Sequence, residues 1–157
     1  MSRAFVREPD ADVAAAQDAL PDRPISAHPN FVTATGLQLI DERLRGLAVE
    51  RDAAKARADS ASLMALTREQ RYWSARRASS QIVAALAAPD VIRFGVTVTL
   101  ELSSGIRRAY RIVGEDEADP KTGTLSYISP LAKQLLGRNV GDGVEVGEQH
   151  ATIVALN

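Results

Sequence analysis

The chain contains no cysteine and only two histidines, His28 and His150, among its 157 residues. Without cysteine it can form no disulfide bond, no thiolate zinc site and no cysteine nucleophile. Two isolated histidines do not favour a histidine-based catalytic triad or a His-rich metal site. The composition therefore argues against hydrolases of the familiar kinds.

The chain also lacks a strong charge of either sign and a long apolar run. Its 19 basic groups divide into three in residues 1–30, nine in 31–90 and seven in 91–157, against 20 acidic groups overall. No segment is basic enough to neutralise many phosphates, so we expect a protein partner and no direct, sequence-specific nucleic-acid binding. The apolar runs fall far short of the ~20 residues of a membrane span, and the first residues carry no stretch of signal-peptide length. We therefore expect a cytoplasmic protein with no membrane partner.

Three segments of different character follow one another along the chain. Residues 1–30 hold four of the seven prolines and five acidic groups, which predicts a flexible or loosely docked tail. Residues 31–90 show helical periodicity, and residues 91–157 show the alternation typical of β-strands. We expect three domains with boundaries after residues 30 and 90.

Apolar and small residues recur three and four positions apart in two stretches of residues 31–90. A Thr-Gly-Leu-Gln capping box at 35–38 precedes the first stretch, and a Thr-Arg-Glu-Gln box at 67–70 precedes the second. Pro89 ends the second stretch. The pattern predicts an antiparallel coiled-coil hairpin whose packing thins toward its tip. The expected seam is Leu37, Ile40, Leu44, Leu47, Arg51, Ala54, Ala58 and Ala61 on the first helix, and Tyr72, Ala75, Ser79, Ile82 and Leu86 on the second.

After residue 90 the hydrophobic period changes to two. This alternation predicts strands at 96–102, 106–113 and 124–128, with shorter strands at 144–146 and 151–156. Between them, Ser129 is placed to cap a short helix that begins with Pro130 and ends before Gly137. The fold class expected for the whole chain is α+β: a helical hairpin followed by a small antiparallel sheet domain with one short helix.

Three blocks in this region resemble the GreA/GreB family of bacterial transcription elongation factors. They are YRIVGEDEAD at 110–119, ISPLAKQLLG at 128–137 and VGDGVEV at 140–146, and FVTATGLQLI at 31–40 resembles the first helix of the family. The resemblance implies an FKBP-like C-terminal domain that docks at the rim of the secondary channel of RNA polymerase, with the hairpin inserted into that channel. The partner-binding residues it implies here are Asp119, Ser129, Pro130 and Leu131.

The resemblance also implies a chemistry for the hairpin tip. Typical members carry an Asp and a Glu three residues apart, in a string that ends in Tyr, and these carboxylates help to hold a Mg²⁺ ion during RNA cleavage. Aligning that Tyr with Tyr72 places Ala65 and Arg68 at the two positions, and neither supplies a carboxylate. We therefore expect a shortened, non-enzymatic, Gre-like regulator that binds polymerase without stimulating cleavage, with no metal ligands or cofactor of its own. The expected tip residues are Asp59, Leu63, Met64, Ala65, Arg68, Glu69 and Trp73.

Three alternative functions remain open from the sequence. A true cleavage factor would use Asp59 or Glu69 at the tip. A regulator resembling the regulator of nucleoside diphosphate kinase would share the C-terminal domain. A peptidyl-prolyl isomerase would need an aromatic-lined pocket, for which this domain offers Phe94, Tyr110 and Tyr127.

Overall fold

The computed structural model describes residues 21–157, so most of the expected tail lies outside the described residues. The chain forms two compact units. Of the described residues, the first unit holds 21–27 and 42–78, and the second holds 28–41 and 79–157. The division falls within a helix that the expected domains keep whole, and the domain boundaries after residues 30 and 90 stay predictions. Two helices and a mixed β-sheet make this an α+β fold, as expected.

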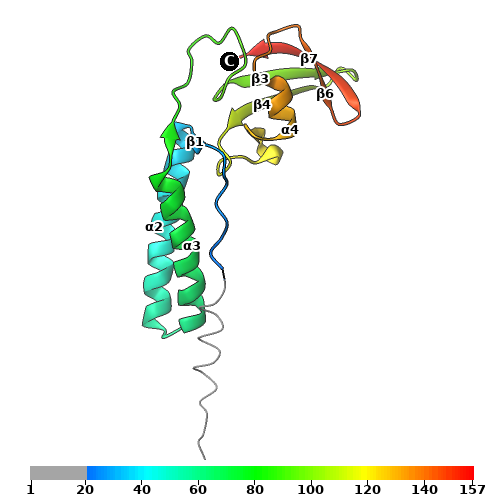
Figure 1. Cartoon of the computed structure of the whole chain (residues 1–157). Helices are drawn as coiled ribbons and strands as arrows, with labels where there is room; N and C mark the ends of the chain where they lie inside the picture. The colour runs from blue at the N-terminus through cyan, green and yellow to red at the C-terminus, as the bar shows by residue number, and fades with distance from the viewer. Residues whose placement is uncertain (1–20) are drawn as a thin grey trace, which may run out of the picture. The chain divides into compact units, whose positions relative to one another are not determined.

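The hairpin consists of helices α2 (Ala34–Ala56) and α3 (Ser60–Ala78), which lie side by side in Figure 1. Ile40, Leu47 and Ala54 on α2 are fully buried and seven residues apart, as the predicted seam requires, whereas Ala61, expected in the same seam, is exposed in α3. Leu44 in the same seam is only half-buried. The small Ala54 at the outer end of this line makes the packing thinner toward the tip.

Three predicted features of the hairpin are wrong. Helix α3 begins at Ser60 instead of after Thr67, whose hydroxyl donates to the carbonyl of Leu63, four residues earlier within the helix. Ala58 lies in the turn and not in the seam, with a positive φ of 53°. The first helix is capped by Thr33 instead of Thr35, because the Thr33 hydroxyl accepts the backbone N–H of Gly36 at 2.9 Å.

The second helix also ends eleven residues before Pro89, at Ala78. Strand β2 (Gln81–Ile82) follows it and pairs in parallel with β1 (Phe31–Val32). The N–H groups of Gln81 and Val83 donate to the carbonyls of Asn30 and Val32 at 2.8 and 3.0 Å. β-Branched residues and serines compete poorly for helix, so these strand bonds prevail there. Ile82 and Leu86, expected in the seam, are 60% and 48% exposed.

The C-terminal sheet contains five strands in the order β5-β4-β3-β7-β6. The predicted strands are confirmed, although the β4–β5 pairing is parallel and the sheet is therefore mixed instead of purely antiparallel. The strands are β3 (Thr97–Leu102), β4 (Arg107–Val113), β5 (Thr124–Ser126), β6 (Gly143–Val146) and β7 (Gln149–Leu156).

Alternation along β3 builds the core of this unit. Val98, Leu100 and Leu102 point to the buried face, and the polar residues between them are half-buried. They pack with side chains of neighbouring strands and with helix α4 (Pro130–Leu135), whose Ala132 and Leu135 are fully buried. Burying these side chains is the main favourable contribution to the stability of the domain.

Two close contacts join β1 and the start of α2 to this domain. A Cβ built on Gly114 would lie 2.3 Å from the carbonyl oxygen of Phe31, so only glycine lets the backbones approach. Glu117 accepts a hydrogen bond from the Thr33 hydroxyl at 2.5 Å, directly beside Gly36 at the helix N-terminus. A carboxylate there also interacts favourably with the helix dipole. The first turns of α2 are thereby fixed to the sheet domain.

Candidate functional site

The tip of the hairpin is a three-residue turn, Arg57, Ala58 and Asp59, between α2 and α3. Ala58 adopts the left-handed conformation there, which costs a non-glycine residue about 1–2 kcal/mol. Asp59 ends the turn and caps α3, because its Oδ1 accepts the backbone N–H of Ser62 at 3.0 Å. The sequence signal for the start of α3 is Asp-Ser-Ala-Ser at 59–62, an ordinary N-cap pattern.

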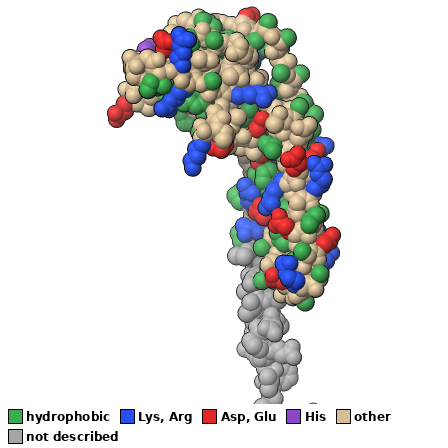
Figure 2. All heavy atoms as spheres, turned by 180° about the vertical axis from the view of Figure 1, so that it is seen from behind, with side chains coloured by type: hydrophobic (Ala, Val, Ile, Leu, Met, Phe, Trp, Pro, Cys, Tyr) green, Lys and Arg blue, Asp and Glu red, His purple; other side chains and the backbone are tan. Residues whose placement is uncertain are grey.

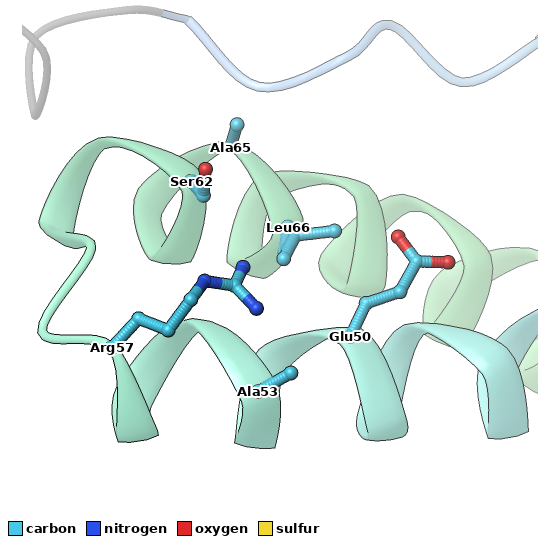
Figure 3. A pocket seen from close by; sticks show the side chains of 6 residues that line it. All are labelled: Glu50, Ala53, Arg57, Ser62, Ala65 and Leu66. Atoms are coloured by element: carbon cyan, nitrogen blue, oxygen red, sulfur yellow. The ribbon is translucent and has the colours of Figure 1, made fainter.

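A hollow of about 410 Å³ lies between the helices next to this turn. Its lining residues are Glu50, Ala53, Arg57, Ser62, Ala65 and Leu66. Figure 3 shows the Arg57 side chain extending from the end of α2 into the space between the helices, with the Glu50 carboxylate reaching toward α3 farther from the turn. Ala53 and Ala65 contribute only methyl groups to its lining. Its surface is mixed in charge and partly apolar.

The tip carries a single carboxylate that is already engaged. Between Lys55 and Ser62 the charged residues are Lys55, Arg57 and Asp59, two basic against one acidic, a formal charge of +1. The hydrogen bonds from Ser62 lower the pKa of Asp59 below its usual 3.8, and the positive charge of Arg57 acts in the same direction. Across residues 21–157, no three His, Asp or Glu side chains gather as ligands for a metal ion. The donor set at the tip therefore does not fit a Mg²⁺ ion, which prefers several oxygen ligands.

The Asp59 cap makes the stability of α3 depend on pH. The pKa of Asp59 is lower in the folded chain than in the unfolded chain. The cap therefore stabilises α3 fully above the unfolded pKa near 3.8, and this stabilisation is lost as the pH falls through the folded pKa. We expect the helical signal in circular dichroism to fall at acid pH. In Asp59→Asn, which still accepts the Ser62 N–H but does not titrate, the drop below pH 4 should be smaller. An identical acid transition in both proteins would contradict the role of this cap.

The other expected tip residues lie along α3 instead of at the turn. Leu63 and Met64 are half-buried in its first turns, and Ala65 is exposed at the hollow. Arg68, Glu69 and Trp73 belong to later turns, and at 1.5 Å per residue Glu69 is about 15 Å along the helix from Asp59. Asp59 and Glu69 thus do not form a pair. The tip assignment of Arg68, Glu69 and Trp73 is wrong, because α3 begins seven residues before the predicted start at Thr67.

One contact on α3 was not anticipated from the sequence. Arg23 lies over the ring of Tyr72, with 3.8 Å between its guanidinium carbon and the ring centroid, and its Nη1 is 3.1 Å from Glu69 Oε2. Asp22 pairs with Arg71 at 3.4 Å. No local sequence pattern links residues nearly fifty positions apart, so only the fold could reveal this contact.

The expected partner-binding residues of the C-terminal unit lie around two turns. Ser129 caps α4 by accepting the N–H of Ala132 at 3.3 Å, Pro130 is exposed at the first helical position, and Leu131 packs against the core. Asp119 caps the short 3-10 helix η1 (Pro120–Thr122) through the N–H of Lys121. Asp119 and Pro130 are therefore the exposed members of this set, and of the two Asp119 has a capping role.

Two of the three aromatic residues considered for an isomerase pocket, Phe94 and Tyr127, pack on each other and on Phe31. Phe31, Phe94 and Tyr127 have ring centroids 5.5–6.0 Å apart, and the Tyr127 hydroxyl donates to the carbonyl of Pro29 at 2.6 Å. Tyr110 packs against the core. Such tilted and edge-on contacts stabilise the fold.

Charged side chains are interleaved in sign on the hairpin face displayed in Figure 2. Arg43 and Glu50 form one exposed pair on α2, 3.3 Å apart, and Arg51 bonds to Gln70 across the hairpin. Alternating signs give no basic surface for nucleic acid on this face. Within residues 21–157, no helix is both long and apolar enough to cross a membrane.

The sequence of this chain is similar to known proteins of one family. Residues 87–156 match the family described as Transcription elongation factor, GreA/GreB, C-term. Transcription elongation factor GreA of Geobacillus kaustophilus is 51% identical over 73 residues, which cover 43% of this chain and 46% of that protein. Over this and the next most similar GreA factors, the chain spans about half of their length.

A longer match covers the hairpin as well. GreA of Cereibacter sphaeroides is 32% identical over 148 residues, which cover 80% of this chain and 98% of that protein. The crystal structure of GreA factor homolog 1 (Gfh1) of Thermus thermophilus is 23% identical, with a TM-score of 0.41 over 83% of this chain and 99% of that one. From the near-complete match to GreA of Cereibacter sphaeroides, the chain belongs to the GreA/GreB family of transcription elongation factors.

Proposed function

We propose that this protein binds RNA polymerase as a regulator of transcription elongation and does not stimulate RNA cleavage. The observation that carries the proposal is the match to GreA over 98% of that protein's length, combined with a tip of a different chemistry. The C-terminal unit docks on the polymerase, and the hairpin enters the secondary channel, as the family resemblance implies.

The charge at the tip supports the second half of the proposal. Asp59 in the turn and Ser62 in the first turn of α3 have the three-residue spacing of the carboxylate pair in typical members, but Ser62 carries a hydroxyl. The Asp59 carboxylate is engaged in capping α3, and the basic Arg57 lies two residues away. A tip of this composition occupies space in the channel and offers a cation one carboxylate, already used as a helix cap, instead of a pair.

Docking is tested at the start of α4. We expect Pro130→Asp to weaken binding to core RNA polymerase about tenfold or more, the effect of losing a central contact residue. An acidic residue suits the first turn of a helix, so the fold should remain intact. Affinity is measured by fluorescence anisotropy of the labelled full chain, and folding by circular dichroism.

The matched control is Ile106→Asp, which places the same charge on a 54% exposed residue outside the three sequence blocks. This variant should bind polymerase as the unmodified protein does. Equal affinity of Pro130→Asp and the unmodified chain would remove α4 from the interface. A chain that fails to bind polymerase at all would contradict the proposed function. Leu131 is unsuitable for this test because it packs against the core.

A further inference from the structure

The segment before the hairpin places an arginine on an aromatic and acidic surface of α3. We call Glu69, Tyr72 and Trp73 the α3 platform. The guanidinium carbon of Arg23 is 3.8 Å from the Tyr72 ring centroid and 5.7 Å from that of Trp73. The two rings meet edge to face at 5.3 Å, and Glu69 accepts a hydrogen bond from Arg23 Nη1 at 3.1 Å. The platform therefore provides both a ring face and a carboxylate for one guanidinium group.

The contact is held by individually weak interactions. The Arg23 and Glu69 side chains are 41% and 35% exposed, and the neighbouring Asp22 and Arg71 side chains are both 62% exposed. Ion pairs at such exposure contribute little and are screened by salt. Residues 21–25 contain two prolines and lie in no helix or strand, so they make no ladder of backbone bonds that would hold them. The segment can leave the platform at low cost.

We propose that the α3 platform is a guanidinium-binding surface, which Arg23 occupies within the chain and an arginine-bearing segment of a partner protein occupies in exchange. The bound segment itself indicates the chemistry of the partner. An arginine stacks on Tyr72 and pairs with Glu69, and an acidic residue just before it pairs with Arg71. Residues 21–25 then act as a displaceable strap that covers the platform until the partner replaces it. This inference does not depend on polymerase binding.

Trp73 gives a direct measurement, because it is the only tryptophan of the chain. In the full-length protein, Arg23→Ala should raise the accessibility of Trp73 to acrylamide and shift its emission. Loss of a cation–π contact at an exposed site changes the ratio of bound to released strap about two- to fivefold. Arg23→Lys, which keeps the charge without the planar group, should give an intermediate change. The control Arg43→Ala removes an exposed ion pair on α2 and should leave Trp73 unchanged.

The exchange is tested by titrating Arg23→Ala with a peptide of residues 21–27 and with the same peptide carrying Ala in place of arginine. The arginine peptide should protect Trp73 saturably, and the alanine peptide should not. The unmodified protein should bind the arginine peptide more weakly than the variant, because its platform is occupied. Unchanged quenching in Arg23→Ala would overturn the strap. Failure of the arginine peptide to protect the variant would overturn the binding surface for a partner.

Discussion

Leu47→Ala is expected to lower the free energy of unfolding by about 2–5 kcal/mol, the cost of truncating a fully buried leucine. Leu47 has no exposed surface and lies between Ile40 and Ala54 in the buried line of α2. Ile40 and Ala54 are each seven residues away, about 10.5 Å along the helix axis, too far to fill the cavity. The measurement is urea unfolding followed by the helical signal in circular dichroism.

The same helix supplies a matched control. Val49 is 70% exposed, so Val49→Ala removes methyl groups that are already largely in water and should change stability by no more than about 0.5 kcal/mol. Leu44, which the seam pattern does not distinguish from Leu47, is half-buried, and Leu44→Ala should cost less than Leu47→Ala. Equal losses in Leu47→Ala and Val49→Ala would contradict the assignment of the buried line.

The sheet domain could be predicted from sequence because its signals are local. A period of two along 96–102 fixes which side chains of β3 are buried, and Ser129 with Pro130 specifies the start of α4. The parallel pairing of β4 with β5 could not be predicted, since it depends on how the connection through η1 returns the chain. Local pattern determines strands, whereas their direction in a sheet is a property of the whole chain.

The hairpin could be predicted only in part, because its end signals compete. Thr67 and Asp59 both read as helix starts, and the structure uses Asp59, which leaves Thr67 inside α3. The end of α3 depends on the pairing of β2 with β1, whose strands are fifty residues apart. The Gly114 contact with Phe31 that holds β1 is likewise invisible to any window along the sequence.

Because the turn lies at residues 57–59, different residues correspond to the two carboxylates of typical family members. The sequence alignment on Tyr72 compares the family's carboxylates with Ala65 and Arg68, but both lie within α3, beyond the turn. The pair with the same spacing that begins at the turn is Asp59 and Ser62, with Ser62 in the first turn of α3. Asp59 then supplies one of the two carboxylates. The other would stand at Ser62, whose backbone N–H the Asp59 side chain accepts.

The protein is expected to release no factor-dependent 3′ fragments from a backtracked elongation complex. The family's cleavage chemistry depends on paired carboxylates at the tip, and a hydroxyl at Ser62 is a far weaker cation ligand than a carboxylate. The formal charge of +1 between Lys55 and Ser62 opposes a cation further. The measurement is a stalled complex with 3′-labelled RNA, incubated with and without the full-length protein. Fragments above the factor-free level would show the proposal to be wrong.

Ser62→Glu separates the two causes of inactivity, missing carboxylates and short reach. The new side chain stands at the third position after the Asp59 cap, where glutamate completes a capping box, so α3 should be stabilised. If the missing carboxylate is decisive, this variant gains cleavage, while Ser60→Glu, which adds the same charge at a different spacing, does not. If Ser62→Glu binds polymerase and stays inactive, the arm length remains as the cause, because the 23 residues of α2 extend only about 35 Å. A gain in both variants would mean that net charge, and not the three-residue spacing, governs what the tip does in the channel.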